Sequence, residues 1–151
     1  MAENLIVVGV DGSASSREAL RWAAGQAELT GGSLRVVMAW FWPVVSGYAP
    51  PPPEMDLARD AEVVVDGLVA DVLGDSPGAP VEKRVVEGAP AAVLVEASSE
   101  AALLVVGSRG HGAFAGMLLG SVSAHCVSHA RCPVVVVRDR GHGGPSLGGT
   151  S

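Results

Sequence analysis

A glycine-rich segment holds the residues of this sequence that are best suited to bind a ligand. Residues 107–121 read GSRGHGAFAGMLLGS; an apolar run, 102–106, precedes them and a helix-like stretch follows. A glycine loop that leads into a helix N-terminus exposes backbone N–H groups and lets an anion approach closely. The segment therefore predicts a site for a phosphate chain, although glycine richness alone also fits a loop that only needs tight turns.

The common phosphate-binding and hydrolase motifs are missing from the sequence. A P-loop needs a lysine after its glycines, and Lys83, the only lysine, lies in a predicted strand. The turn after the first predicted strand, residues 11–16, reads DGSASS and lacks the G-x-G-x-x-G of dinucleotide-binding folds. No G-x-S-x-G elbow is present, which argues against serine hydrolase chemistry.

The composition is that of one globular domain. The chain has 151 residues, of which 48% are apolar, and no apolar run approaches the ~20 residues that span a membrane. The N-terminal residues 1–4 have no basic region, so we expect no secretory signal and a cytoplasmic location. The net charge of −6 argues against nucleic acid and anionic membrane as main partners.

Strand and helix patterns alternate along the chain. The strands are short, nearly continuous apolar runs, which are typical of a parallel sheet covered on both faces. We expect an α/β doubly wound domain over residues 1–138, with a five-stranded parallel sheet of order 3-2-1-4-5 and helices on both faces, and a disordered Gly/Ser-rich tail over 139–151. The expected strands are 4–10, 34–40, 81–86, 102–106 and 133–138, and the helices are about 15–30, 55–73, 90–99 and 121–130.

Local signals refine this layout. Ser15 or Ser16 is expected to cap the first helix, and Gly31 to end it. Charges at residues 82–84 suggest that the third strand is an edge strand. In the expected order, the first and fourth strands meet where the strand order reverses, and such folds bind ligands at that point. Asp11 comes directly after the first of these strands, and Gly107 comes directly after the fourth. Both residues should therefore lie in the same crevice.

The glycine spacing resembles a known family. Gly107-x2-Gly110-x9-Gly120-Ser121 is similar to the G-x2-G-x9-G-[ST] pattern of the ATP-binding universal stress proteins. The resemblance extends over residues 4–138. It includes the opening VVGVDGS at 7–13, the GAP at 88–90 and the HARCPV at 129–134.

This resemblance implies a nucleotide-binding regulatory domain that binds ATP, with Mg²⁺, and usually forms a homodimer. Asp11 would lie beside the adenosine, and the backbone near Ala39 and Trp40 would contact adenine. The glycine loop would cradle the ribose and phosphates, with Ser121 and Ser123 able to donate hydroxyl hydrogen bonds. The full set of implied contact residues is Asp11, Gly12, Ser13, Ala39, Trp40, Gly107, Arg109, Gly110, His111, Gly120, Ser121, Val122 and Ser123.

Asp11 and Arg109 also fit other roles. The Asp11 carboxylate also suits a turn or a helix cap, or a ligand for phosphate-bound Mg²⁺. Arg109 also suits a solvated position on the loop.

We predict a homodimer through the strand Pro133–Arg138, because that apolar strand would otherwise form an open sheet edge. An unidentified protein partner would distinguish the nucleotide-bound form from the nucleotide-free form.

We predict no catalytic residue. His111 is the only nearby candidate base, and a glycine-rich loop fixes its position poorly. The alternative is a slow ATP hydrolase of the related adenine-nucleotide α-hydrolase-like architecture, but the S-G-G-x-D-S signature of those enzymes is absent after the first strand.

Two histidines and two cysteines lie close together near the C-terminus. His125, Cys126, His129 and Cys132 suggest a zinc site at first sight, but their spacing is not that of a four-ligand site, and we predict no metal ligands. Cys126 is expected to be reduced and to pack inside the last helix, and a redox role for either thiol stays open.

Overall fold

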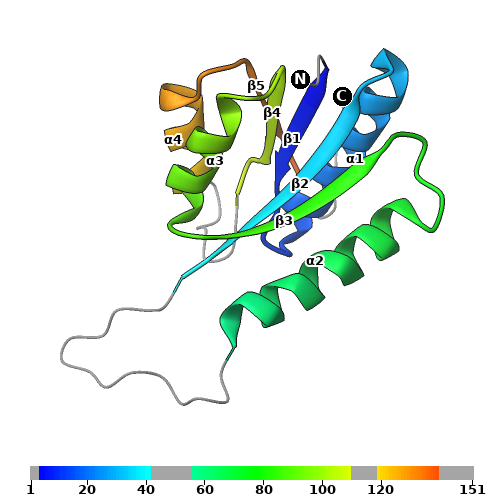
Figure 1. The fold of residues 1–151 in the computed structure, drawn as a ribbon. Helices are drawn as coiled ribbons and strands as arrows, with labels where there is room; N and C mark the ends of the chain where they lie inside the picture. Colours follow the sequence, from blue (N-terminus) through cyan, green and yellow to red (C-terminus); the bar gives the residue numbers. More distant parts are fainter. Residues whose placement is uncertain (1–3, 42–55, 110–118, 140–151) are drawn as a thin grey trace, which may run out of the picture.

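A computed structural model of the chain describes residues 4–41, 56–109 and 119–139. Strands and helices alternate along the whole described chain (Figure 1). In order, the elements are β1 (Leu5–Gly9), α1 (Ala14–Thr30), β2 (Ser33–Trp40), α2 (Leu57–Leu73), β3 (Val81–Glu87), α3 (Pro90–Ser98), β4 (Leu103–Gly107), α4 (Ser121–His129) and β5 (Val134–Val137).

The strands form one parallel sheet in the order β3-β2-β1-β4-β5, which confirms the predicted topology. β1 is central: Val7 pairs with Arg35 of β2 on one side and with Leu104 of β4 on the other. β3 and β5 are the two edges, and the charged β3 is at an edge as its sequence predicted. The carboxyl ends of β1 and β4 therefore lie side by side at the reversal of strand order.

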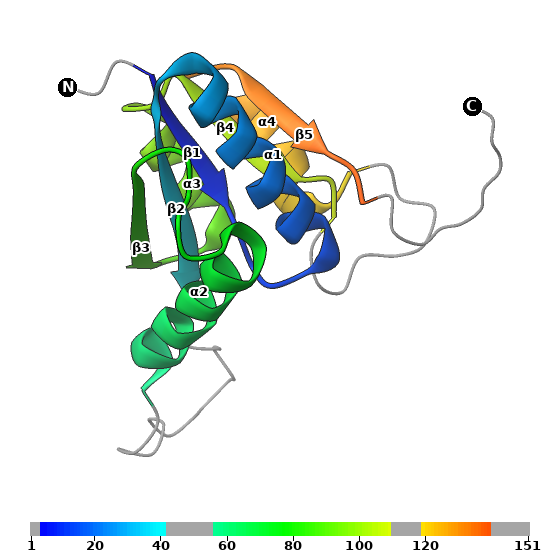
Figure 2. The same ribbon diagram turned by 90° about the vertical axis from the view of Figure 1, so that its right-hand side faces the viewer.

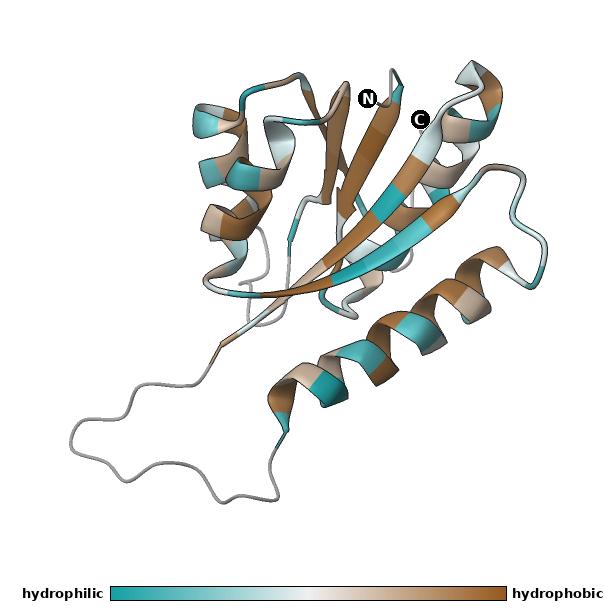
Figure 3. Cartoon of the chain, in the orientation of Figure 1, coloured by the Kyte–Doolittle hydropathy of each residue, from teal (hydrophilic) through white to brown (hydrophobic). Residues whose placement is uncertain are grey.

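Helices cover both faces of the sheet, because the strands are apolar on both faces. Figure 2 shows α1 and α2 in front of the sheet and α3 and α4 behind it. Val8 and Val36 pack under the front pair, together with Leu20 of α1. Val7 and Leu104 pack in the rear core, which is separate. In Figure 3, β1 and β4 are brown along their length, whereas β3 carries a teal stretch.

The start of α1 differs from the sequence expectation. The helix begins at Ala14, and Ser13 is its cap: the Ser13 hydroxyl accepts a hydrogen bond from the amide of Ser16 at 3.2 Å. Ser15 and Ser16, the predicted caps, are both buried within the first turn. Ser16 instead donates to the carbonyl of Ser13 at 3.0 Å. The helix ends before Gly31, as predicted.

The other element boundaries agree with the sequence predictions to within about two residues, as is usual for helix and strand ends. Two predicted features lie outside the described residues: the middle of the glycine loop with Gly110 and His111, and the tail beyond Asp139.

Candidate functional site

The turn after β1 brings Asp11, Gly12 and Ser13 to the carboxyl end of the sheet. Asp11 Oδ1 accepts a hydrogen bond from the Ser13 amide at 2.9 Å, and the Asp11 amide donates to the Ser16 hydroxyl at 3.3 Å. Gly12 has φ 85°, a left-handed conformation that favours glycine. Asp11 thus shapes the turn, which is one of the roles predicted for this carboxylate, and its place beside a nucleoside stays a prediction.

β2 extends past the end of β1 and forms a wall beside this turn. The last residue of β1, Gly9, lies opposite Val37, so Ala39 and Trp40 continue beyond it. The Trp40 carbonyl accepts a hydrogen bond from the amide of Gly88 at 2.8 Å, which ties β2 to the turn after β3. The fold therefore places the predicted adenine-contacting backbone at the same end of the sheet as Asp11.

The end of β4 packs closely against the first turn of α1. A Cβ atom at Gly107 would lie 2.7 Å from both the carbonyl carbon and the Oγ of Ser15, so this position has no room for a side chain. Ser15 Oγ lies 3.4 Å from the hydroxyl of Ser108 and from the carbonyl oxygen of Val137, and it accepts a hydrogen bond from the amide of Arg109 at 3.3 Å. This buried serine contact joins α1, β4 and β5.

One carbonyl group, that of Ser108, joins the two ends of the glycine loop. The Ser108 carbonyl oxygen accepts a hydrogen bond from the Gly120 amide at 2.7 Å and another from the Ser123 hydroxyl at 2.9 Å. The Ser108 amide in turn donates to the Val137 carbonyl at 2.8 Å. Ser108 and Gly120, which lie before and after residues 109–119, are therefore held together.

These bonds correct one sequence expectation. The Ser123 hydroxyl has one hydrogen, which is directed to the carbonyls of Ser108 and Gly120, and the side chain is buried. In this conformation the hydroxyl of Ser123 holds the loop closed and is not available to donate to a phosphate. Ser121 is exposed, and the contact of its hydroxyl with a phosphate stays a prediction.

The start of α4 supplies backbone donors. Gly120 is the cap, with extended backbone (φ −75°, ψ 173°) and no side chain to bond the first amides. The amides of Ser121, Val122 and Ser123 have no carbonyl partner within the helix, and the first turn carries no acidic side chain. These amides and the positive end of the helix dipole suit an anion.

Sequence reasoning missed the contact between Ser15 and Ser108. Both residues are buried at 4% exposure and join elements that are far apart in the chain. The only sequence signal for Ser108 is its place directly after a strand. The local pattern at Ser15 indicates a helix cap, and it gives no sign of a contact with residues more than ninety positions away.

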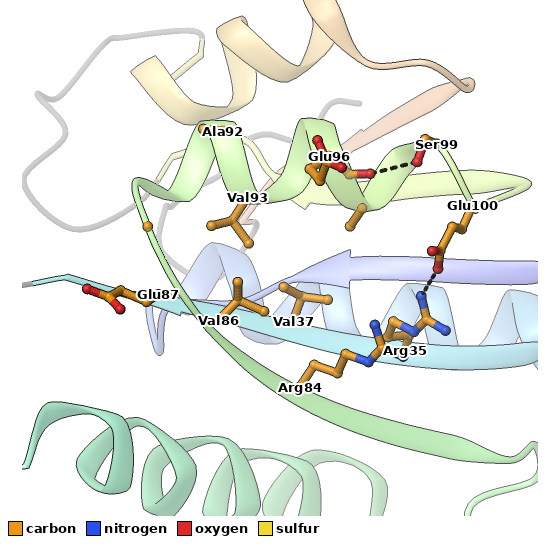
Figure 4. Close-up of a pocket in the computed structure, with 12 residues that line it drawn as sticks. Arg35, Val37, Arg84, Val86, Glu87, Ala92, Val93, Glu96, Ser99 and Glu100 are labelled. Carbon is orange, nitrogen blue, oxygen red and sulfur yellow. Dashed lines mark hydrogen bonds and ion pairs between the residues drawn. The ribbon is translucent and has the colours of Figure 1, made fainter.

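A separate cavity of about 390 Å³ lies between α3 and the faces of β2 and β3 (Figure 4). Its two arginines are already paired: Arg35 contacts Glu82 at 2.9 Å and Glu100 at 2.7 Å, and Arg84 contacts Glu82 at 2.6 Å. The hydrogen bond from Arg35 lowers the pKa of both carboxyl groups. Because its cations are neutralised, this cavity is a poorer phosphate site than the start of α4.

Comparisons with known proteins agree with this fold. A model of the universal stress protein family matches residues 4–138. A universal stress protein of Mycolicibacterium smegmatis is 39% identical over 140 residues, which cover 87% of this chain and 47% of that protein. The chain thus spans about half the length of the curated relatives it matches.

Two solved structures carry nucleotides. A universal stress protein in complex with cAMP is 33% identical, with a TM-score of 0.60 and coverage of 92% of this chain and 99% of that chain. The universal stress protein of Archaeoglobus fulgidus in complex with dAMP is 25% identical, with a TM-score of 0.67 and coverage of 91% and 99%.

The close approach at Gly107 predicts a stability change. Gly107→Ala should lower the free energy of unfolding by about 1–3 kcal/mol, because the new methyl group overlaps the backbone of Ser15. Gly67→Ala is the matched control: Gly67 lies in α2 with no atom near its added Cβ, so alanine should stabilise the protein by about 0.5–1 kcal/mol. Urea denaturation measures both, and equal effects of the two substitutions would contradict the packing at Gly107.

Proposed function

Because the chain belongs to the universal stress protein family, we propose that it binds an adenine nucleotide, ATP with Mg²⁺, in the crevice between the turn after β1 and the start of α4. The observation that carries this proposal is the closed base of the glycine loop. The Ser108 carbonyl brings the two ends of the G-x2-G-x9-G-[ST] segment together at the point where strand order reverses. A phosphate chain fits there because backbone amides and a helix dipole converge.

Each part of the crevice has a role in this proposal. The amides of Ser121, Val122 and Ser123 bind the phosphates, and the Ser121 hydroxyl adds a donor. The adenosine lies between the Asp11 turn and the overhang of β2 at Ala39 and Trp40. Arg109 is a further phosphate contact, Gly110 and His111 keep the contacts that the family resemblance implies, and Asp11 is the predicted carboxylate ligand for Mg²⁺.

The adenine class is supported by the relatives that were solved with cAMP and dAMP. The choice of ATP rests on the G-x2-G-x9-G-[ST] spacing, which the sequence shares with the ATP-binding universal stress proteins. Within the described residues, no helix has the length and apolar character to cross a membrane. We propose that the protein acts in the cytoplasm as a regulator. Nucleotide binding would change a surface that another protein recognises.

We further propose a homodimer through β5. All four valines of β5 are half-buried, and none is fully covered within one chain. The other edge, β3, carries Glu82, Lys83 and Arg84, and charges on an edge strand oppose pairing. Pairing two β5 edges around a two-fold axis would cover the apolar edge and leave the charged one in solvent.

A substitution at the cap of α4 tests the phosphate site. Gly120→Val should weaken ATP binding at least about tenfold, equal to about 1.4 kcal/mol, because its side chain would cover the first amides of the helix. Gly67→Val in α2, far from the crevice, should leave the affinity unchanged. Calorimetry with Mg-ATP measures both variants after circular dichroism has established their fold. A folded Gly120→Val protein with the affinity of the wild type would rule out this site.

Edge substitutions test the dimer. The wild type should scatter light as twice the chain mass of 15.2 kDa at micromolar concentration. Val135→Lys should give a monomer, because a charged edge opposes pairing. Val86→Lys on the opposite edge is the control and should stay dimeric. A monomeric wild type, or a folded Val135→Lys protein that remains a dimer, would reject the β5 interface.

A steady-state assay separates the regulator from the slow hydrolase. We expect turnover of Mg-ATP far below the ~1–10³ s⁻¹ of ordinary enzymes, because the described site offers amides and hydroxyls and its one carboxylate is held in a turn. At saturating Mg-ATP, His111→Ala and Asp11→Ala should show the same low rate, although Asp11→Ala should weaken the binding of Mg-ATP. Turnover of several per second that collapses in either variant would identify an enzyme.

A further inference from the structure

The structure divides the four potential metal ligands near the C-terminus into two groups. Cys126 is completely buried in the rear core, and burial raises the pKa of its thiol to about 11. Cys132 is half-buried, burial raises the pKa of its thiol as well, and its Sγ contacts the carbonyl of Pro133. Because Cys126 is inaccessible from the surface and the thiol of Cys132 is hydrogen-bonded to a carbonyl, the cysteines are poor ligands. His125 and His129 remain, and both are exposed.

The two histidines lie next to each other on the surface of α4. They lie one turn apart on α4, and their ring centroids are 4.2 Å apart with 23° between the planes. Nδ1 of His129 lies 3.1 Å from the carbonyl oxygen of His125. A carbonyl oxygen only accepts hydrogen bonds, so this Nδ1 carries a proton, and the lone pair of the neutral ring is on Nε2. Histidines that bind metals commonly have this kind of bond, which fixes the ligating nitrogen.

We propose that His125 and His129 chelate one divalent transition-metal ion on the outer surface of α4, with Nε2 of His129 as one ligand and water in the remaining positions. Rotation of the exposed His125 ring about its side-chain torsions would open the stack and bring its own nitrogen to the ion. This site is independent of the proposed nucleotide site, because its residues do not contribute to the crevice.

The imidazole nitrogens of the pair determine which metal ions should bind. Imidazole nitrogens suit Ni²⁺, Cu²⁺ and Zn²⁺, whereas Mg²⁺ and Ca²⁺ prefer oxygen ligands. Two protein ligands leave the other coordination positions of the ion to water and impose little geometry on it. The affinities should therefore follow the general order of divalent first-row metals, with Cu²⁺ above Ni²⁺ and Zn²⁺ and with Mn²⁺ weakest. Within the part of the chain that the structure describes, no group of three or more His, Cys, Asp or Glu side chains could hold a metal ion, so the pair has no third protein ligand and no such group competes with it.

The position on the helix favours a cation. His129 is the last residue of α4, where the negative end of the helix dipole lies, and the net charge of −6 adds a general attraction. α4 has only nine residues, a length that is marginal without tertiary packing. An ion that joins positions one turn apart would hold its last turn, so binding should slow hydrogen exchange of the α4 amides.

The test uses Ni²⁺ and Zn²⁺ as probes, with the full chain and no purification tag. Calorimetry should give one Ni²⁺ per chain. His125→Ala and His129→Ala should each weaken binding at least about tenfold, because the second ligand of a chelate acts at high effective concentration. His111→Ala and His142→Ala keep the pair and should bind as the wild type does.

A relocated pair is the matched control. The double substitution Val127→His with His129→Ala keeps the number of imidazoles but places them two residues apart, on different faces of the helix. Val127 is 51% exposed, so the change should not disturb the core. This variant should bind as weakly as His129→Ala alone and show no slowing of exchange in α4. Equal Ni²⁺ affinity of this variant and the wild type, or no binding by the wild type at millimolar Ni²⁺, would overturn the proposal.

Discussion

The hydrogen bond between the Gly120 amide and the Ser108 carbonyl, at 2.7 Å, determines where the glycine loop starts and ends. The loop leaves at the end of β4, and this bond returns it to the same carbonyl before α4 begins. The Ser123 hydroxyl strengthens the junction, and the Ser108 amide anchors it to β5. Whatever conformation the residues between them take, the first amides of α4 stay beside the central strands.

Close packing around that junction depends on small residues. Gly107 has no space for a side chain because the backbone of Ser15 lies against it. The Ser15 hydroxyl then contacts Ser108, directly after β4, and Val137 of β5. This junction is therefore built from glycine and serine, because the start of α1 and the ends of β4 and β5 meet there. Larger residues would separate them.

The charge distribution explains how an acidic chain can hold a phosphate. The arginines of the cavity beside α3 are neutralised by Glu82 and Glu100, so they do not attract a second anion. The start of α4 has no acidic side chain in its first turn, and its donors are backbone groups. Binding by backbone dipoles needs no excess of lysine or arginine, which agrees with a net charge of −6.

Local patterns predict the fold well, whereas long-range contacts escape them. The apolar runs of β1 and β4, and the charged β3, indicate the strand order and the edge because these properties are local. The prediction of Ser15 or Ser16 as the cap of α1 is wrong because several hydroxyls compete within one turn. The Ser15–Ser108 contact and the use of the Ser123 hydroxyl depend on how distant elements pack, and no spacing in the sequence encodes them. The sequence likewise does not show that the thiols are buried or half-buried while His125 and His129 are exposed, because this depends on how α4 is oriented against the sheet.

The most direct test of the nucleotide site is to map amide chemical shifts by NMR during a titration with Mg-ATP. Binding at the crevice predicts the largest shifts at the amides of Gly107, Ser108 and Arg109 and at those of Ser121–Ser123, with smaller shifts at Asp11–Ser13. Shifts that instead cluster around Arg35, Arg84 and Glu100, with the start of α4 unchanged, would contradict binding at the crevice and move the ligand to the cavity beside α3.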